Sequence, residues 1–274
     1  MKKETMRKSR FWILWAFLIL AAAQILPSGP GLCLALPTDS VIPDLGVPET
    51  DGNVLAIAAT STHNKEISDW TVILYVTNIN DSGAGSLRQA IADAYNSYAI
   101  GFIEGLNGQT ITLTSGEIVI DKYLTILGLG MNDLTISGHD ASRVFNIAAG
   151  KTVEITDLTI SHGYVTESNP KGGGIYNEGS LTLNRVNVSN CACEGIGGTS
   201  TRAQGGGIYS ASGASLTMTD CRVHQNTAEG HHLLVGSDYR ADDARGGGLC
   251  NFGTLTMNRC EVSNNTASSL EEGS

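Results

Sequence analysis

Histidine and aspartate side chains gather in one short stretch of the sequence, residues 228–245. Together with one tyrosine, they are His231, His232, Asp238, Tyr239, Asp242 and Asp243. Imidazole nitrogens and carboxylate oxygens bind divalent metals, so a loop that folds back here could hold an ion. A solvated acidic loop is the competing interpretation, because two adjacent aspartates are a weak signal. We therefore predict a candidate ligand surface at these six residues and assign no metal and no cofactor.

Cysteine thiols are the second group with possible chemistry. The five that follow the N-terminal region are Cys191, Cys193, Cys221, Cys250 and Cys260. The Cys-x-Cys at 191–193 lacks a second pair at zinc spacing. Cys221 and Cys260 occupy the same place in consecutive repeats, so we predict two stacked, inward-facing thiols. Parallel side chains are poorly oriented for a disulfide.

Catalytic motifs are not evident. Ser161-His162-Gly163 is similar to a motif of polysaccharide hydrolases built on β-helices, but the paired aspartates and basic residues that accompany it are not on neighbouring repeats. We interpret His162 as a turn residue. Polysaccharide lyase chemistry would need calcium-binding carboxylates and a basic residue on stacked strands, where this sequence has mostly Thr, Ser and Asn. No phosphate-binding loop, nucleophile elbow or HExxH occurs.

The N-terminus has the pattern of an export signal. Residues 1–10 are basic, and residues 11–23 form an unbroken apolar run. A run of that length is short for a bilayer span and is typical of a signal-peptide core. We predict a signal peptide over 1–35, with an uncleaved anchor as the alternative, and a poorly ordered leader over 36–70. The remaining chain is then exported, and is either secreted or held at the cell surface.

Charge excludes one class of partner. The formal net charge is −10, and residues 1–35 carry five basic residues and one acidic residue, so the rest of the chain stands at −14. A field of that sign repels a phosphate backbone, and we expect no nucleic-acid partner.

An internal repeat must position these residues. Gly-Gly-Gly blocks begin at 172, 205 and 246, and each precedes a block of alternating apolar and polar residues. Those blocks are SLTLNRVNVSN at 180–190, SLTMTDCRVHQN at 215–226 and TLTMNRCEVSNN at 254–265. Upstream, apolar-polar-apolar segments recur without the glycines, none longer than about five residues.

This spacing predicts an all-β fold, a right-handed parallel β-helix over 71–267 with a tail at 268–274. We expect about five to six coils of three short strands each, stabilised by stacking on their neighbours. Corresponding points in successive coils are Ile111, Leu134, Leu158, Val186, Cys221 and Cys260.

The repeats lengthen along the chain because extra residues enter at one place. We expect these insertions, 163–171, 192–204 and 228–245, to project as loops from one edge of the stack. Insertions on one face of a solenoid often form a binding surface, although loop drift without a role is the alternative.

Several residues are expected to have structural roles. The glycine triplets, with Gly173, Gly206 and Gly247 at their centres, are expected to allow tight corners or positive φ where the loop rejoins the sheet. Asn226 and Asn265 lie in equivalent Asn-Thr-Ala turns, where stacked side chains could form an amide ladder.

A short amphipathic helix is predicted near 86–96, with Leu87 and Ile91 on its buried face and Ser86 or Ser82 as its cap. We expect it to cover the open end of the stack.

The same region carries a family resemblance. Val76-Thr77-Asn78, followed by Gly85-Ser86-Leu87-Arg88-Gln89-Ala90-Ile91, resembles the CSLREA-type segment of bacterial surface β-helix proteins, with Gly85 where that pattern has cysteine. The Gly-Gly-Gly-Ile-Tyr-Asn and Asn-Asn-Thr-Ala blocks resemble repeats of polymorphic outer-membrane proteins and adhesin passengers. The resemblance implies an exported surface protein, outer-membrane associated at full length, of which this chain is an N-terminal piece.

Three functions follow from these features. The first is non-catalytic adhesion or display, with surface glycans or proteins of a host or neighbouring cell as partners. The second is a glycan-binding module that uses the three insertions. The third is a polysaccharide lyase or hydrolase whose catalytic coils lie beyond residue 274.

Overall fold

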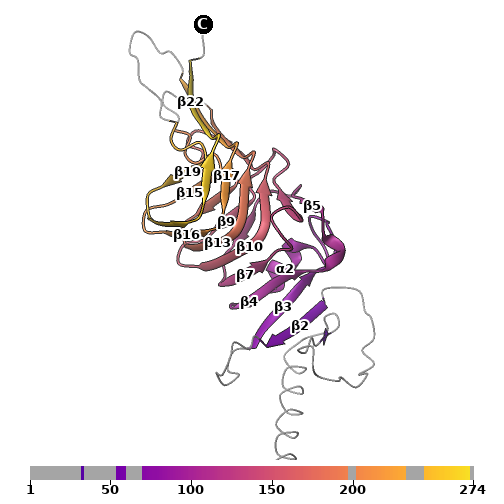
Figure 1. Cartoon of the computed structure of the whole chain (residues 1–274). Coiled ribbons are helices and arrows are strands. Elements are labelled where there is room, and N and C mark those ends of the chain that lie inside the picture. The colour runs from indigo at the N-terminus through magenta and orange to yellow at the C-terminus, as the bar shows by residue number, and fades with distance from the viewer. Residues whose placement is uncertain (1–31, 34–53, 60–69, 197–201, 233–243, 272–274) are drawn as a thin grey trace, which may run out of the picture.

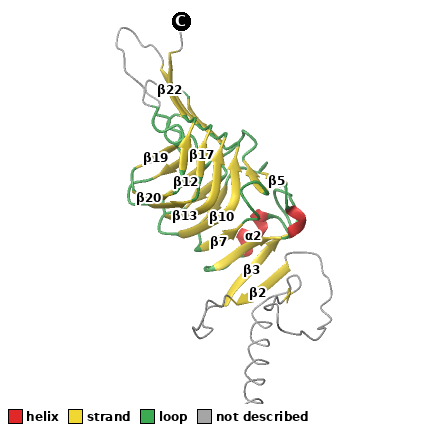
Figure 2. Ribbon diagram, in the orientation of Figure 1, coloured by secondary structure: helices red, strands yellow, loops and turns green. Residues whose placement is uncertain are grey.

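The computed structural model describes residues 32–33, 54–59, 70–196, 202–232 and 244–271. These residues form a stack of β-strands with β2 and β3 toward one end and β22 at the other (Figures 1 and 2). Apart from residues 32–33, the predicted signal peptide lies outside the described residues, as does most of the predicted leader. Within the described part, no helix is both long and apolar enough to cross a bilayer.

Three sheets make up the stack. Sheet A has 13 strands: β1 (Leu32–Cys33), β2 (Val54–Ala59), β3 (Trp70–Val76), β4 (Tyr98–Phe102), β5 (Gln109–Thr112), β7 (Leu124–Leu127), β8 (Leu134–Ser137), β10 (Thr152–Ser161), β13 (Ser180–Ser189), β16 (Ser215–Thr219), β17 (Arg222–His224), β20 (Thr254–Asn258) and β21 (Glu261–Ser263). Sheet B contains β6 (Ile118–Ile120), β9 (Phe145–Ile147), β12 (Ile175–Asn177), β15 (Ile208–Ser210) and β19 (Leu249–Asn251). Sheet C contains β11 (Tyr164–Glu167), β14 (Ala192–Gly195), β18 (Thr227–His232) and β22 (Thr266–Glu271).

The chain visits these sheets in a repeating order. Each repeat first adds a strand to one half of sheet A, which consists of β4, β7, the first parts of β10 and β13, β16 and β20. It then adds a strand to the second half, which consists of β5, β8, the last parts of β10 and β13, β17 and β21. It next crosses to sheet B and returns to sheet A one strand further along. From β10 onward, a strand of sheet C precedes each strand of sheet B. The pairings between successive repeats are parallel, and the β2–β3 pair is antiparallel.

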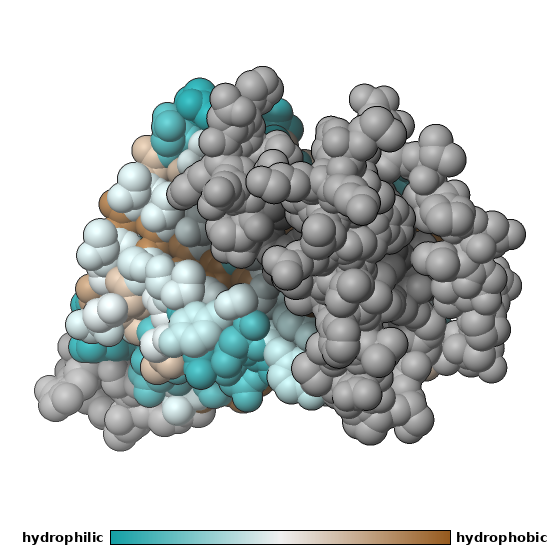
Figure 3. All heavy atoms as spheres, turned by 90° about the horizontal axis from the view of Figure 1, so that it is seen from below, coloured by the Kyte–Doolittle hydropathy of each residue, from teal (hydrophilic) through white to brown (hydrophobic). Residues whose placement is uncertain are grey.

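The core lies between the sheets and is built from inward columns of aliphatic side chains. In the second half of sheet A one such column contains Ile111, Ile136, Ile160, Val188 and Val223, all fully buried. Alternation places Thr, Ser and Asn on the opposite, outer face of the same strands. Seen from below, the described surface is mostly pale to teal and is crossed by a brown band (Figure 3).

The first repeat is offset from the predicted alignment. The prediction aligns Ile111 with Leu134, but Ile111 pairs with Ile136 and Leu134 pairs with Gln109. The predicted alignment is therefore shifted by two residues at this point. The remaining predicted correspondences follow the observed register, as in the pairing of Leu158 with Val186. A shift of two residues leaves every side chain on the same face, so alternation alone could not detect it.

Strands β10 and β13 are each ten residues long, longer than the predicted limit. Each one bends at its centre, where Asp157 and Arg185 adopt φ values of 56° and 50°. The equivalent residues in the next two repeats are Asp220 and Arg259, with φ values of 53° and 52°. We call these four residues the corner column, because they turn the chain from the first to the second half of sheet A.

Charges alternate along the corner column. The guanidinium of Arg185 donates two hydrogen bonds of 2.6 Å to the carboxylate of Asp157, and Arg259 binds Asp220 in the same way. The hydrogen bonds from Arg185 hold the pKa of Asp157 below its ordinary value, and the hydroxyl of Thr156 contributes in the same direction. Each bidentate pair therefore links two consecutive repeats.

The lowered pKa of Asp157 predicts a pH dependence of stability. A carboxylate whose pKa falls on folding stabilises the protein above its unfolded pKa, and this contribution is lost as the pH falls through the folded value. In the Asp157→Asn variant, the free energy of unfolding should therefore fall less steeply with decreasing pH below about pH 4 than it does in the unchanged protein. Urea unfolding at several pH values measures the effect. Asp121→Asn, at an exposed aspartate outside the column, is the control, and an equal flattening there would contradict the assignment.

Helix α2 (Leu87–Asp93) confirms the predicted amphipathic helix, although it ends at Asp93 rather than near residue 96. Ser86 caps it, with its hydroxyl accepting a hydrogen bond from the Gln89 N–H at 3.1 Å. Leu87 and Ile91 are buried in the core cluster that also contains side chains of β3 and β4. Arg88 anchors the helix by donating to the carbonyl oxygens of Gly116 and Glu117. A short 3-10 helix (Glu104–Leu106) follows β4.

Gly85, which precedes this helix, has no room for a side chain. Its φ is 79°, and a Cβ atom would lie 2.2 Å from the Oγ1 atom of Thr77. The structure thus requires glycine at the position where the resembled segment has cysteine.

Strand β2 lies inside the predicted leader, where no regular element was expected. Val54–Ala59 pairs antiparallel with β3 over six residues. The structure thus assigns six residues of the predicted leader to a strand. This pairing gives hydrogen-bond partners to the backbone groups on the edge of β3 that faces away from β4. The sequence pattern did not predict the pairing.

The first and second glycines of each triplet have different structural roles. The first glycine of each triplet has positive φ: 62° at Gly172, 69° at Gly205 and 60° at Gly246. The second glycines, Gly173, Gly206 and Gly247, instead lie against neighbouring backbone. A Cβ atom on each of them would lie 2.0–2.2 Å from the carbonyl oxygen of the first residue of a sheet C strand. The positive φ predicted for the triplets therefore belongs to the first glycine, and close packing explains the second.

Asn226 and Asn265 form the predicted amide ladder. The Nδ2 atom of Asn226 donates to the Oδ1 atom of Asn265 at 2.9 Å and to the carbonyl of Val188 at 3.0 Å. The Oδ1 atom of Asn226 accepts from the N–H of Cys191 at 3.0 Å. Asn226 is fully buried. The ladder thus joins three consecutive repeats.

Candidate functional site

The predicted ligand surface lies largely outside the described residues. Asp238, Tyr239, Asp242 and Asp243 are not described. His231 and His232 end strand β18 and pair with Leu270 and Glu271 of β22. Among the described side chains, no group of three or more His, Cys, Asp or Glu residues could hold a metal ion.

The three insertions begin as strands rather than as loops. Tyr164–Glu167, Ala192–Gly195 and Thr227–His232 are β11, β14 and β18, and together with β22 they form the parallel sheet C. The segments predicted as loops therefore begin as strands, and these strands are stacked side by side in one sheet. Parallel pairing satisfies their backbone groups, which loops would leave to water.

A polar groove of about 450 Å³ lies on the outer face of the second half of sheet A. Its floor carries two rows of hydroxyl groups in register. Thr110, Thr135 and Thr159 form one row, and Ser137, Ser161 and Ser189 form the other. Successive members of a row come from neighbouring strands, about 4.8 Å apart.

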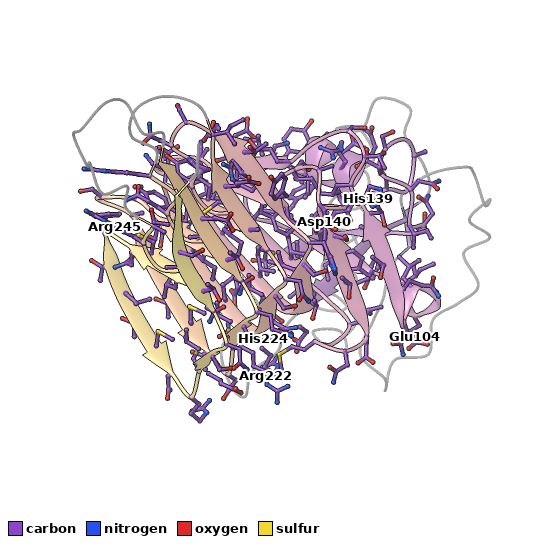
Figure 4. The ribbon with its side chains drawn as sticks, turned by 90° about the horizontal axis from the view of Figure 1, so that it is seen from above. Glu104, His139, Asp140, Arg222, His224 and Arg245 are labelled. Atoms are coloured by element: carbon purple, nitrogen blue, oxygen red, sulfur yellow. The ribbon has the colours of Figure 1, made fainter. Side chains whose placement is uncertain are left out.

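Turn residues form one wall of the groove: His139, Asp140, His162 and Asn190. All four adopt positive φ between 50° and 59°, so they mark the corner where each strand ends. This confirms His162 as a turn residue. Its Nδ1 atom lies 3.1 Å from the hydroxyl oxygen of Ser161, and the His139 N–H donates to the hydroxyl of Ser137 at 3.2 Å. Figure 4 shows His139 and Asp140 next to each other.

The same outer face continues toward the C-terminal repeats with charged side chains. Arg222 and His224 of β17 lie next to each other, as Figure 4 shows. In the pairing register, Arg222 is the neighbour of Asn187 on one side and of Glu261 on the other. The hydroxyl of Ser263 donates to Glu261 at 2.8 Å. The face therefore changes from hydroxyl rows to a mixed-charge patch.

An aromatic column occupies the outer face of sheet B. The rings of Tyr176 and Tyr209 stack with centroids 5.4 Å apart, and Phe252 lies 5.7 Å beyond Tyr209. Arg143 and Lys171 cover the two tyrosine rings at 5.2 Å. Burial and a hydrogen bond to Glu178 raise the pKa of Tyr176 to about 12. These ring faces are occupied by protein, so we do not place a ligand there.

The five cysteines after the N-terminal region all carry free thiols. Cys191, Cys193 and Cys221 are buried, and desolvation raises their pKa values to about 12, 12 and 11. Cys221 and Cys260 directly precede the paired strands β17 and β21 and so occupy the same place in consecutive repeats, as predicted, but Cys260 is half-buried. Thiols with raised pKa values are poor nucleophiles, so burial argues against a reactive cysteine among these three.

The groove is suited to hydrogen bonding with a polar ligand. Its hydroxyl, amide and imidazole groups supply both donors and acceptors. Sequence reasoning identified the outward Thr and Ser positions but did not recognise them as a site. The signal was available in the aligned repeats, where the outward residues of consecutive strands are almost all small and polar. Searches of family models, curated proteins and solved structures found no match to this chain.

Proposed function

We propose that this protein is an exported, right-handed parallel β-helix that acts in adhesion or display, without catalysis, by binding surface glycans in the polar groove. The observation that carries the proposal is the pair of hydroxyl rows in an open groove of about 450 Å³. The β-helix itself is supported by the repeating order of the three sheets and by the parallel register between repeats. Export is supported by the apolar run at 11–23.

A glycan is favoured over a protein partner by the chemistry of the groove. Sugar hydroxyls both donate and accept hydrogen bonds, as do the threonine and serine side chains that face them. No large apolar side chain lines the groove, and such side chains are enriched at the centres of protein interfaces.

A substitution that fills the groove tests the proposal. Thr135→Trp should reduce glycan retention at least tenfold, because Thr135 lies in the middle of its row between Thr110 and Thr159. A glycan array probed with the full chain identifies the ligand, and titration with that glycan measures the loss. The matched control is Thr125→Trp, an outward threonine on β7 that does not line the groove.

Three results would contradict the proposal. The chain could retain no glycan, or both tryptophan variants could lose binding equally. Product release from a polysaccharide panel at enzyme-like rates would refute the non-catalytic part and favour a lyase or hydrolase.

A further inference from the structure

The polar groove ends one strand before a pair of nitrogen-bearing side chains. In the pairing register, Asn187 and Ser189 of β13 are the neighbours of Arg222 and His224 of β17. Ser189 lines the groove, so the row of serine hydroxyls leads directly to His224. Neighbouring strands are about 4.8 Å apart. A ligand that lies across the strands in the groove therefore reaches both side chains by extending over one more strand.

The guanidinium of Arg222 has no partner within the part of the chain that the structure describes, although it is exposed. Four other arginines each form an ion pair with a carboxylate: Arg88, Arg143, Arg185 and Arg259. Glu261, the neighbour of Arg222 on the far side, instead accepts a hydrogen bond from the hydroxyl of Ser263 at 2.8 Å. Because a guanidinium binds a carboxylate through two parallel hydrogen bonds, Arg222 is suited to receive a carboxylate from a ligand.

His224 places a second polar group beside this guanidinium (Figure 4). Its Nδ1 atom lies 3.0 Å from the Oε1 atom of Gln225, which is a hydrogen-bond acceptor. The Nδ1 atom therefore carries the ring hydrogen, and the Nε2 atom is left to bind a ligand hydroxyl. The hydroxyl rows suit the neutral part of a glycan, whereas Arg222 and His224 suit a sugar that carries both an acid and hydroxyl groups.

The charge of the rest of the molecule limits how many acids the ligand carries. Asp140 lines the groove itself, so a second carboxylate over the hydroxyl rows would be repelled. The chain after residue 35 has a formal net charge of −14, which disfavours a polyanion as a whole. That field is screened beyond about 8 Å at physiological ionic strength, whereas a carboxylate in contact with Arg222 is not.

We propose that the groove binds an oligosaccharide laid across the strands, with neutral sugars over the hydroxyl rows and one terminal acidic sugar at Arg222 and His224. The terminal sugar is recognised by its carboxylate, which Arg222 binds. This inference rests on the proposed glycan function and adds the class of glycan and the direction in which it lies.

The test compares each glycan with its own uncharged form. The glycan array is probed with the full chain twice, once with the carboxyl groups of the glycans intact and once after their chemical reduction to alcohols. The retained glycan is then titrated in both forms with the unchanged chain and with Arg222→Gln. The matched control is Arg245→Gln, at an exposed arginine that Figure 4 shows apart from Arg222.

We expect the retained glycans to end in an acidic sugar, and reduction of its carboxyl group to weaken binding at least tenfold. Arg222→Gln should lower the affinity for the acidic form to that of the reduced form. Its affinity for the reduced form should stay unchanged, which also shows that the variant is folded. Arg245→Gln should alter neither affinity, and Thr135→Trp should weaken both.

The failure of this inference can be told apart from the failure of the glycan function. Retention of glycans with equal affinity before and after reduction would refute the acidic sugar and leave the groove as a glycan site. Retention of neither form would refute the glycan function and this inference with it. Tighter binding of polyuronates than of glycans with one terminal acid would refute the limit to a single carboxylate.

Discussion

Replacing Gly206 with alanine should lower the free energy of unfolding by about 3 kcal/mol or more, since overpacking against an immovable backbone exceeds the usual cost of a core insertion. The new Cβ atom would lie 2.2 Å from the Thr227 carbonyl oxygen and 2.4 Å from that of Gly247. The Thr227 oxygen belongs to the paired strand β18, and the Gly247 oxygen accepts a hydrogen bond from the Gly207 N–H, so neither can move without disturbing contacts between repeats. Urea unfolding followed by far-UV circular dichroism measures the loss.

Gly213→Ala is the matched control for this substitution. Gly213 has a φ of 84° but open space around its Cα atom. Alanine there should cost only about 1–2 kcal/mol, the usual strain of a left-handed conformation. Equal losses for the two variants would contradict close packing as the reason for the second glycine.

Asn226→Ala is the second substitution with a large expected effect. It would leave the Cys191 N–H and the Val188 carbonyl without partners in the interior. Each unsatisfied buried group costs about 1–3 kcal/mol, so the unfolding free energy should fall by about 2–6 kcal/mol. Thermal and urea unfolding measure the change.

Asn265→Ala separates this burial effect from the hydrogen bonds themselves. Asn265 also bonds in the ladder, but it is half-buried, so water can replace its side chain. Its loss should therefore be near 1 kcal/mol. If Asn265→Ala destabilised the protein as much as Asn226→Ala, burial would not be the cause.

Local features were predicted well from the sequence. Helix α2 follows from a serine cap and apolar residues spaced for one helix face, and both signals lie within one short segment. Strand positions and inward faces follow from alternation, as at Ile155 between Ile126 and Leu183. The Asn226–Asn265 ladder follows from identical turn sequences in consecutive repeats.

The candidate site was predicted poorly, and the reason is physical. The groove joins Thr110 to Asn190, residues that are far apart in the chain, and only stacking brings their strands together. The sequence drew attention to residues 228–245 because their side chains are chemically conspicuous. Hydroxyl rows have no such conspicuous chemistry when they are considered one residue at a time.

The sequence by itself determined which residues form most strands of sheet A, which face of those strands is apolar, and where the repeats begin. These properties depend on neighbours a few positions away, so period and turn chemistry specify them. The tertiary structure alone decided the register of Ile111, the strands of sheet C, the close approach at Gly206 and the position of the groove. A two-residue slip preserves every face, and backbone contacts between repeats leave no local pattern, so these features arise only when the strands stack.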